Sequence, residues 1–111
     1  MRILVVDNNV ELCRALQEYF ETQPDFEVVG LAYDGEQALT LVEELQPDVM
    51  LLDITMPYLD GLGVMERLRP IELERKPKVV AITAFGTDSL LARLMALGAD
   101  YFMVKPFNLD I

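Results

Sequence analysis

The sequence predicts an α/β fold: a doubly wound, five-stranded parallel sheet with helices on both faces. Two observations support this class. Short apolar runs recur along the chain, and amphipathic helical patterns separate them. Such alternation implies right-handed crossovers, and it places functional residues beyond the carboxyl ends of the strands. The 111 residues have room for one compact domain, residues 1–111.

The strands are predicted from runs of apolar residues. Four runs are apolar on both alternating faces, which is typical of inner strands buried between two helical layers; they are 3–6, 49–52, 79–82 and 101–104. A fifth run, 26–32, contains Glu27 and Gly30. We therefore expect it to be a less buried strand at an edge of the sheet.

Helices are predicted between the strands. The first two have apolar stripes at helical spacing, formed by Leu12, Leu16, Tyr19 and Phe20 and by Ala38, Leu41, Val42 and Leu45. The third is expected from Gly61 to Arg69, after a turn at Asp60-Gly61 in which the glycine supplies backbone freedom. The fourth is expected from Asp88 to Leu97, with an acidic N-cap and Gly98 as a left-handed terminator.

A fifth helix would be expected to begin near the end of this chain, at 108–111, so we expect it to be absent. Its absence would leave apolar surface of the first and fifth strands uncovered on one face. We therefore expect the chain to self-associate at concentrations above the micromolar range.

The composition excludes several classes of function. Nine basic and nineteen acidic residues give a net charge of −10, which disfavours binding of DNA or anionic lipid by this chain alone. The chain has no histidine, which excludes histidine-based zinc sites and catalytic triads. The first apolar run is too short for a signal peptide or membrane span, and the single cysteine, Cys13, is predicted to be a buried, inert thiol. We expect a cytoplasmic location.

Polar residues follow four of the predicted strands: Asp7-Asn8-Asn9 the first, Asp53 the third, Thr83-Ala84 the fourth and Lys105-Pro106 the fifth. The carboxyl ends of parallel strands meet at one edge of a sheet, so these groups are expected to lie together. Carboxylates, a hydroxyl and an ammonium in one place are typical of phosphoryl transfer, which needs positioning and neutralisation of charge.

Each group has a predicted role in that chemistry. Asp53 is the nucleophile that accepts the phosphoryl group, and Mg²⁺ would be held by Asp53, Asp7 and Asn8. Lys105 would pair with the phosphoryl oxygens, as would the Thr83 hydroxyl and the backbone N–H of Ala84. Thr83 is then a sensor of the phosphoryl group, and Phe102 is the aromatic residue expected to change its packing with it.

Four motifs carry a resemblance to a known family; they are Leu4-Val5-Val6-Asp7, residues 51–61 (LLDITMPYLDG), Ile82-Thr83-Ala84 and Val104-Lys105-Pro106-Phe107. Together they resemble the response regulator receiver family of two-component signalling. The resemblance implies the flavodoxin-like strand order 2-1-3-4-5 and a signalling domain that assists its own phosphorylation and dephosphorylation but is not an enzyme. It also implies the backbone carbonyl of Thr55 as a metal ligand, Mg²⁺, Ca²⁺ or Mn²⁺ as the metal, and a histidine kinase as a partner.

Within that family the chain is similar to one branch, the receivers of the master regulator of endospore formation in Gram-positive bacteria. The similar passages are 11–19, 26–35, 56–62 and 83–86. This resemblance implies a phosphorelay in which a histidine phosphotransfer protein donates the phosphoryl group. It also implies a homodimer on phosphorylation and DNA binding by a separate carboxyl-terminal domain.

Simpler interpretations exist for each residue. Asp7, Asn8 or Asn9 could cap the first helix, Asp53 could be a solvated turn residue, and Lys105 could belong to a surface ion pair. Thr83 could be only a β-branched strand residue and Phe102 only part of the core. Their joint placement at strand ends favours the functional interpretation over these.

Two other functions are compatible with parts of the sequence. A flavin-binding protein of the same strand order would need a loop rich in glycine, serine and threonine after the first strand, where this chain has Asp7-Asn8-Asn9. The second is a receiver-like interaction module that does not accept phosphate. Asn8 motivates it, because receivers usually have a second acidic metal ligand there and Asn8 is expected to weaken Mg²⁺ binding.

Overall fold

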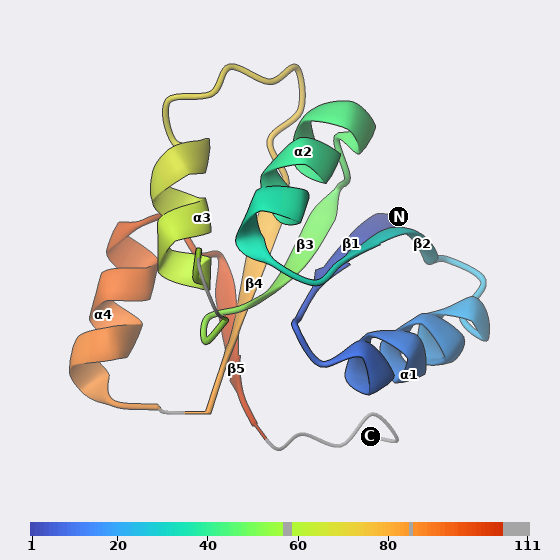
Figure 1. The fold of residues 1–111 in the computed structure, drawn as a ribbon, viewed down its shortest axis with the longest axis horizontal. Coiled ribbons are helices and arrows are strands. Elements are labelled where there is room, and N and C mark those ends of the chain that lie inside the picture. The colour runs from blue at the N-terminus through green and yellow to red at the C-terminus, as the bar shows by residue number, and fades with distance from the viewer. Residues whose placement is uncertain (57–58, 85, 106–111) are drawn as a thin grey trace.

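The structure is a computed structural model, and it describes residues 1–56, 59–84 and 86–105. Its five strands form one parallel sheet in the order β2-β1-β3-β4-β5 (Figure 1). The strands are β1 (Arg2–Val6), β2 (Glu27–Ala32), β3 (Val49–Asp53), β4 (Lys78–Thr83) and β5 (Tyr101–Val104). The predicted fold class and strand order are confirmed.

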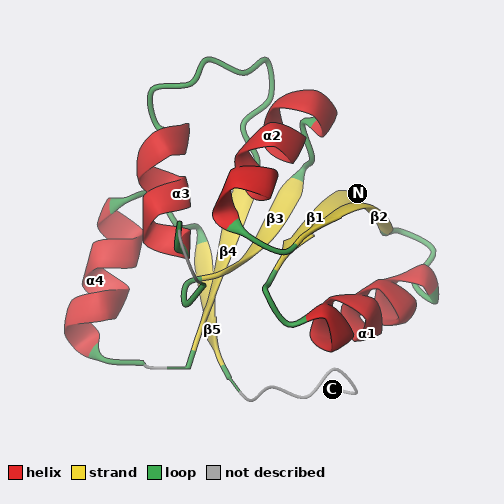
Figure 2. Ribbon diagram, in the orientation of Figure 1, coloured by secondary structure: helices red, strands yellow, loops and turns green. Residues whose placement is uncertain are grey.

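The described helices alternate with the strands and cover both faces of the sheet (Figure 2). They are α1 (Val10–Glu21), α2 (Gly35–Leu45), α3 (Gly61–Leu68) and α4 (Asp88–Ala96). Alternate residues of β1 face opposite sides, so Ile3 and Val5 pack with α1, while Leu4 and Val6 join the core shared with α2, α3 and α4. Each fully buried side chain of this kind contributes about 1.5–3 kcal/mol.

Polar side chains begin each helix and fix where the connecting loop ends. The N-cap residues Asn9, Asp34, Asp60 and Thr87 each accept a backbone hydrogen bond from the first turn. Two predictions about helix starts are corrected by the structure. The N-cap of α4 is Thr87 and not an acidic residue, and Asp60 is a helix cap. Gly98, with φ of 104°, confirms the predicted left-handed terminator.

The prediction of a buried inner strand at 101–104 is wrong. The four residues of β5 are 66%, 43%, 38% and 41% exposed, and β5 is the last strand in the order, where among the described residues it pairs with β4 alone. The uncovered apolar surface expected on the fifth strand is present in β5. The same expectation for the first strand is wrong, since Ile3 and Val5 are buried against Cys13 and Leu16 of α1. The segment in which a fifth helix was expected to begin lies outside the described residues.

The other edge strand agrees with its prediction. Glu27 at the start of β2 is exposed, the next four residues are partly buried, and Ala32 is fully buried. None of the helices in the described part of the chain is long and apolar enough to cross a membrane.

Candidate functional site

Three of the predicted site residues meet at the carboxyl edge of the sheet, where β1, β3 and β5 end. The Lys105 Nζ lies 3.0 Å from the Asp7 Oδ2 and 3.7 Å from the Asp53 Oδ2. Thr83, the last residue of β4, lies at the same edge, and its carbonyl accepts a hydrogen bond of 2.8 Å from the Lys105 N–H. One ammonium therefore bridges two carboxylates that are 46 residues apart in sequence.

The hydrogen bonds of the sheet continue past the strand ends and position the site. The Asp7 N–H donates to the Ala32 carbonyl at 3.0 Å, and the Ile54 N–H donates to the Ile82 carbonyl at 2.9 Å. Each functional side chain is thus attached to backbone held by a neighbouring strand. Such support restricts where the side chains can lie.

Burial separates this group from the rest of the polar surface. Asp7, Asp53 and Thr83 are 2%, 3% and 0% exposed, and they are the buried polar side chains among the described residues. Removing a charge from water is costly unless it is paired. Lys105 supplies that pairing to both carboxylates.

The charges and the burial of the site alter the pKa values of Asp53 and Lys105. Burial, followed by the charge of Asp7, raises the pKa of Asp53, and the hydrogen bond from the Thr55 N–H only partly opposes this. Burial acts to lower the pKa of Lys105, but the hydrogen bond to Asp7 and the charge of Asp53 outweigh it, so the pKa of Lys105 rises. The site therefore carries a carboxylate with poorly compensated charge beside a firmly protonated lysine.

Of the three residues after β1 that could cap α1, Asn9 is the N-cap. Its Oδ1 accepts the Leu12 N–H at 3.1 Å, while its own N–H donates to the Asp7 Oδ1 at 2.8 Å. The capping interpretation is therefore wrong for Asp7, whose second oxygen faces Lys105. Asn8 is exposed beside them.

The donors at this edge fit a hard divalent cation. They are the carboxylate oxygens of Asp7 and Asp53, which both face Lys105. The amide oxygen of Asn8 and the backbone carbonyl of Thr55, which follow β1 and β3 in the sequence, are the further ligands expected from the sequence. Within the described ranges no three histidine, cysteine, aspartate or glutamate residues are grouped as they would be to hold a metal. Two carboxylates and neutral oxygens suit an ion that keeps several waters, such as Mg²⁺.

Gly61 has a role at the site that its sequence context did not reveal. A Cβ at this position would lie 2.6 Å from the Asp53 carbonyl oxygen and 2.7 Å from the Ile54 Cα. The Gly61 N–H donates to the Ile54 carbonyl at 3.1 Å. Gly61 is not among the residues of positive φ, so the predicted need for backbone freedom is wrong. The glycine is required because α3 begins in contact with the backbone that carries Asp53.

Cys13 lies behind the site, as its predicted burial requires. Its Sγ donates to the Asp7 carbonyl at 3.3 Å, and burial together with the charge of Asp7 raises the pKa of its thiol to about 11. The thiolate is the reactive form of cysteine, so this thiol is inert at neutral pH.

The remaining predicted residues lie on β4 and β5 or next to them. Ala84 follows Thr83 and is exposed, which leaves its surroundings open to solvent. Phe102 is 43% exposed and pairs in register with Ala81, whereas Thr83 pairs with Val104. The interpretation of Phe102 as a core residue is therefore wrong. Phe102 lies on the same face of the sheet as Thr83, at the pair two residues before Thr83 along β4. Pro57, Tyr58, Phe85 and 106–111, which carry parts of the sequence motifs, lie outside the described residues.

Comparison with known proteins agrees with this geometry. The family model described as the response regulator receiver domain matches residues 3–111. The response regulator domain of Thermotoga maritima CheB is 30% identical, with a TM-score of 0.86, and the match covers 98% of this chain and 81% of that chain. The receiver domain of the response regulator NarL from Mycobacterium tuberculosis is 29% identical, with a TM-score of 0.88, over 98% of this chain and 86% of that one.

A third solved structure contains ligands. The complex of CheX with CheY, BeF3 and Mg²⁺ from Borrelia burgdorferi matches at 29% identity and a TM-score of 0.88, covering 99% of this chain and 81% of that one. These likenesses identify the family, and they do not tie the chain to the sporulation branch.

Proposed function

Because the chain belongs to the response regulator receiver domain family, we propose that it accepts a phosphoryl group on the carboxylate of Asp53. One observation carries this proposal. Asp53 is a buried carboxylate at the carboxyl edge of the sheet, with the Lys105 ammonium 3.7 Å away and the charge of Asp7 beside it. A buried carboxylate of this kind is costly to keep, which is typical of a functional position.

The proposed step is an in-line transfer from a phosphohistidine. An Asp53 carboxylate oxygen attacks phosphorus, an O–P bond forms, the N–P bond of the donor breaks, and the imidazole leaves with the bonding electron pair and takes up a proton. Lys105 pairs with the phosphoryl oxygens, and the Thr83 hydroxyl and the Ala84 N–H donate hydrogen bonds to them. Mg²⁺ held by Asp7, Asn8, Asp53 and the Thr55 carbonyl would neutralise the charge that gathers between carboxylate and phosphoryl group.

The raised pKa of Asp53 suits the nucleophile. Burial and Asp7 destabilise its anion, so forming a bond to phosphorus relieves a carboxylate that is poorly solvated. The phosphoryl group brings new negative charge to Lys105 and Thr83 in return. Movement of Thr83 toward that charge, followed by repacking of Phe102 on β5, is the proposed switch.

The wider role follows from the sequence resemblance. We propose that residues 1–111 form one cytoplasmic receiver domain and receive the phosphoryl group from a histidine kinase or a histidine phosphotransfer protein. Phosphorylation would favour a homodimer and control a DNA-binding domain that lies outside this chain. Control of sporulation genes is the proposed output, supported by the passages at 26–35 and 56–62.

Intact-mass spectrometry after incubation with acetyl phosphate tests the function. We expect a Mg²⁺-dependent gain of one phosphoryl group in the wild type, its loss in Asp53→Asn, and its retention in Asp34→Asn, a matched change at a helix cap. Asn8→Asp should lower the Mg²⁺ concentration needed for half-maximal phosphorylation, because it adds a charged ligand. A folded wild type that gains no mass would instead favour the phosphate-independent interaction module that Asn8 suggests.

A further inference from the structure

A cavity of about 190 Å³ lies at the opposite end of the sheet from Asp53. Its apolar wall is formed by Met65 and Leu68 of α3, Leu73 and Pro77 of the following loop, and Leu97 at the end of α4. Val79, near the start of β4, also lines the cavity and is 7% exposed. In Figure 1 this long loop connects α3 with β4, on the far side of the molecule from the carboxyl ends of the strands.

The size of the cavity matches one large apolar side chain. An apolar cavity of about 150 Å³ accommodates benzene, so this volume admits a phenylalanine or leucine side chain and little more. A ligand of drug size needs a pocket of roughly 300–1,000 Å³. The cavity therefore suits an anchoring side chain better than a free ligand.

Two cations complete the lining. Arg69 and Lys76 are exposed and line the cavity, and no acidic residue does. Within the described residues neither has an ion-pair partner, whereas Arg67, Arg75 and Arg93 each pair with a carboxylate. The chain has nineteen acidic residues for nine basic ones, so two unpaired cations beside an apolar wall indicate complementarity to a negatively charged ligand.

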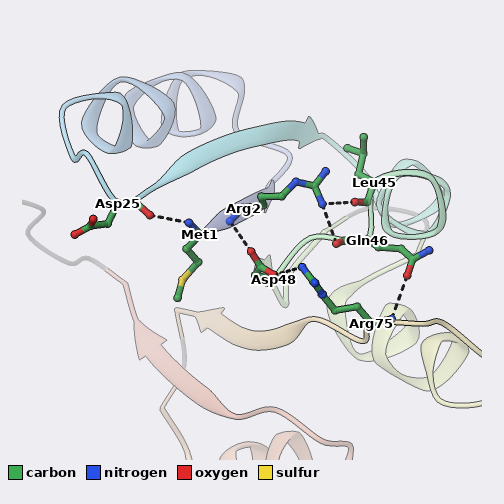
Figure 3. Close-up of polar contacts among 7 residues, drawn as sticks. All are labelled: Met1, Arg2, Asp25, Leu45, Gln46, Asp48 and Arg75. Carbon is green, nitrogen blue, oxygen red and sulfur yellow. Dashed lines mark hydrogen bonds and ion pairs between the residues drawn. The ribbon is translucent and has the colours of Figure 1, made fainter.

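The loop that carries these cations is held in place before any ligand arrives. Figure 3 shows Arg75 bound to the residues before β3: its guanidinium donates to the Asp48 Oδ1 at 2.8 Å, and its N–H donates to the Gln46 Oε1 at 3.1 Å. Asp48 also accepts the Arg2 N–H at 2.8 Å. Lys76 Nζ donates to the Arg69 carbonyl at 3.0 Å. A site whose walls are already ordered loses less entropy on binding.

We propose that this cavity is a docking site for a partner protein segment that inserts one large apolar side chain flanked by carboxylates. The apolar side chain packs against Leu68, Leu73 and Leu97, and the carboxylates pair with Arg69 and Lys76. The site is separate from the phosphoacceptor, because Val79 pairs with Met50 and Ile82 pairs with Asp53, three residues or about 10 Å further along the sheet at roughly 3.3 Å per residue. A partner can occupy it without covering the edge of the sheet that carries Asp53.

The probe is the peptide acetyl-Gly-Asp-Phe-Glu-Gly-amide, titrated into the full chain while backbone amide shifts are followed by NMR. We expect saturable shifts at the cavity residues with a dissociation constant of about 1 mM. Replacing Phe by Ala, or Asp and Glu by Asn and Gln, should each weaken binding about tenfold, which corresponds to about 1.4 kcal/mol. Binding that needs only one of the two features contradicts the proposal.

Variants of the protein separate a local site from general charge. Arg69→Glu and Lys76→Glu should each weaken binding about tenfold, while Arg14→Glu, the same charge change at an exposed position of α1, should leave it unchanged. Asp53→Asn should also leave it unchanged. Well-dispersed spectra establish that each variant is folded. Equal weakening by all three charge reversals, or shifts centred on β5 in place of the cavity, would overturn the proposal.

Discussion

The two ends of β3 each carry an aspartate, and their environments are opposite. Asp48, just before the strand, accepts hydrogen bonds from the Arg2 N–H and the Arg75 guanidinium, which hold its pKa below the usual range. Asp53, at the end of the strand, is buried next to Asp7, and its pKa is raised. One carboxylate is satisfied by donors, and the other is left with charge that its surroundings do not fully compensate.

This contrast separates a structural aspartate from the aspartate proposed as the phosphoacceptor. The ionised form of Asp48 stabilises the fold because it ties β1 to the loop that follows α3. The ionised form of Asp53 costs stability, and such a cost is typical of a functional position. Proximity to a strand end alone does not distinguish the two.

Among the substitutions that test this contrast, removal of the Lys105 charge should change the free energy of unfolding most. Lys105→Met leaves Asp7 and Asp53 buried without a cation, so the free energy of unfolding at pH 7 should fall by about 3 kcal/mol in urea denaturation. Because the pKa of Lys105 is raised, its contribution is present below the ordinary lysine pKa and is lost as the pH rises through the raised value.

Arg93→Met is the matched control for Lys105→Met. Arg93 pairs with Glu66, but the two side chains are 61% and 52% exposed. Loss of this ion pair should change the free energy of unfolding by less than about 0.5 kcal/mol. Equal losses in the two variants would show that burial does not set the strength of the Lys105 pairs.

Asp53→Asn should act in the opposite direction and stabilise the fold. A raised pKa means that stability from Asp53 is present below its ordinary pKa and is lost as the pH rises through the raised value. The neutral amide avoids that loss, so we expect a gain of about 1 kcal/mol at pH 7, or about 4–8 °C in Tm by calorimetry. The gain should vanish in acid, and a Tm below that of the wild type at pH 7 would refute this account.

Asp48→Asn should have the smallest effect, with the reverse dependence on pH. The lowered pKa means that stability from Asp48 is present above its ordinary pKa and is lost as the pH falls through the lowered value. The variant should therefore be slightly less stable than the wild type at pH 7 and equal to it in strong acid. Thermal unfolding measured across the acid range checks this, and a stabilised variant would contradict the contrast between the two aspartates.

The sequence predicted the fold and most of the site because local patterns determine both. Runs that are apolar on both faces indicate strands, and parallel strands bring their carboxyl ends together. The sequence alone therefore groups the polar residues that follow the strands, which are Asp7, Asp53, Thr83 and Lys105. The family's strand order then placed 101–104 last. The apolar pattern alone predicted burial there, because it records the character of a strand and not which neighbours cover it.

Other features depend on contacts that leave no local pattern. The loop after α3 has no hydrophobic period, so the bonds from Arg75 to Gln46 and Asp48 could not be predicted. Gly61 was predicted from turn chemistry, whereas the structure requires it because the Asp53 backbone passes so close. Thr87 and Asp88 are both good capping residues, and only the backbone geometry shows that Thr87 is the cap.

The exposure of β5 bears on how long the site stays assembled. The Lys105 ammonium, which neutralises two buried carboxylates, follows β5, the most exposed strand of the sheet, which among the described residues pairs with β4 alone. Strands of this kind open locally at a lower free energy than the core does, and their amides exchange hydrogen sooner. Each such opening withdraws Lys105 from Asp7 and Asp53. The lifetime of the closed strand therefore limits how long the cluster remains complete.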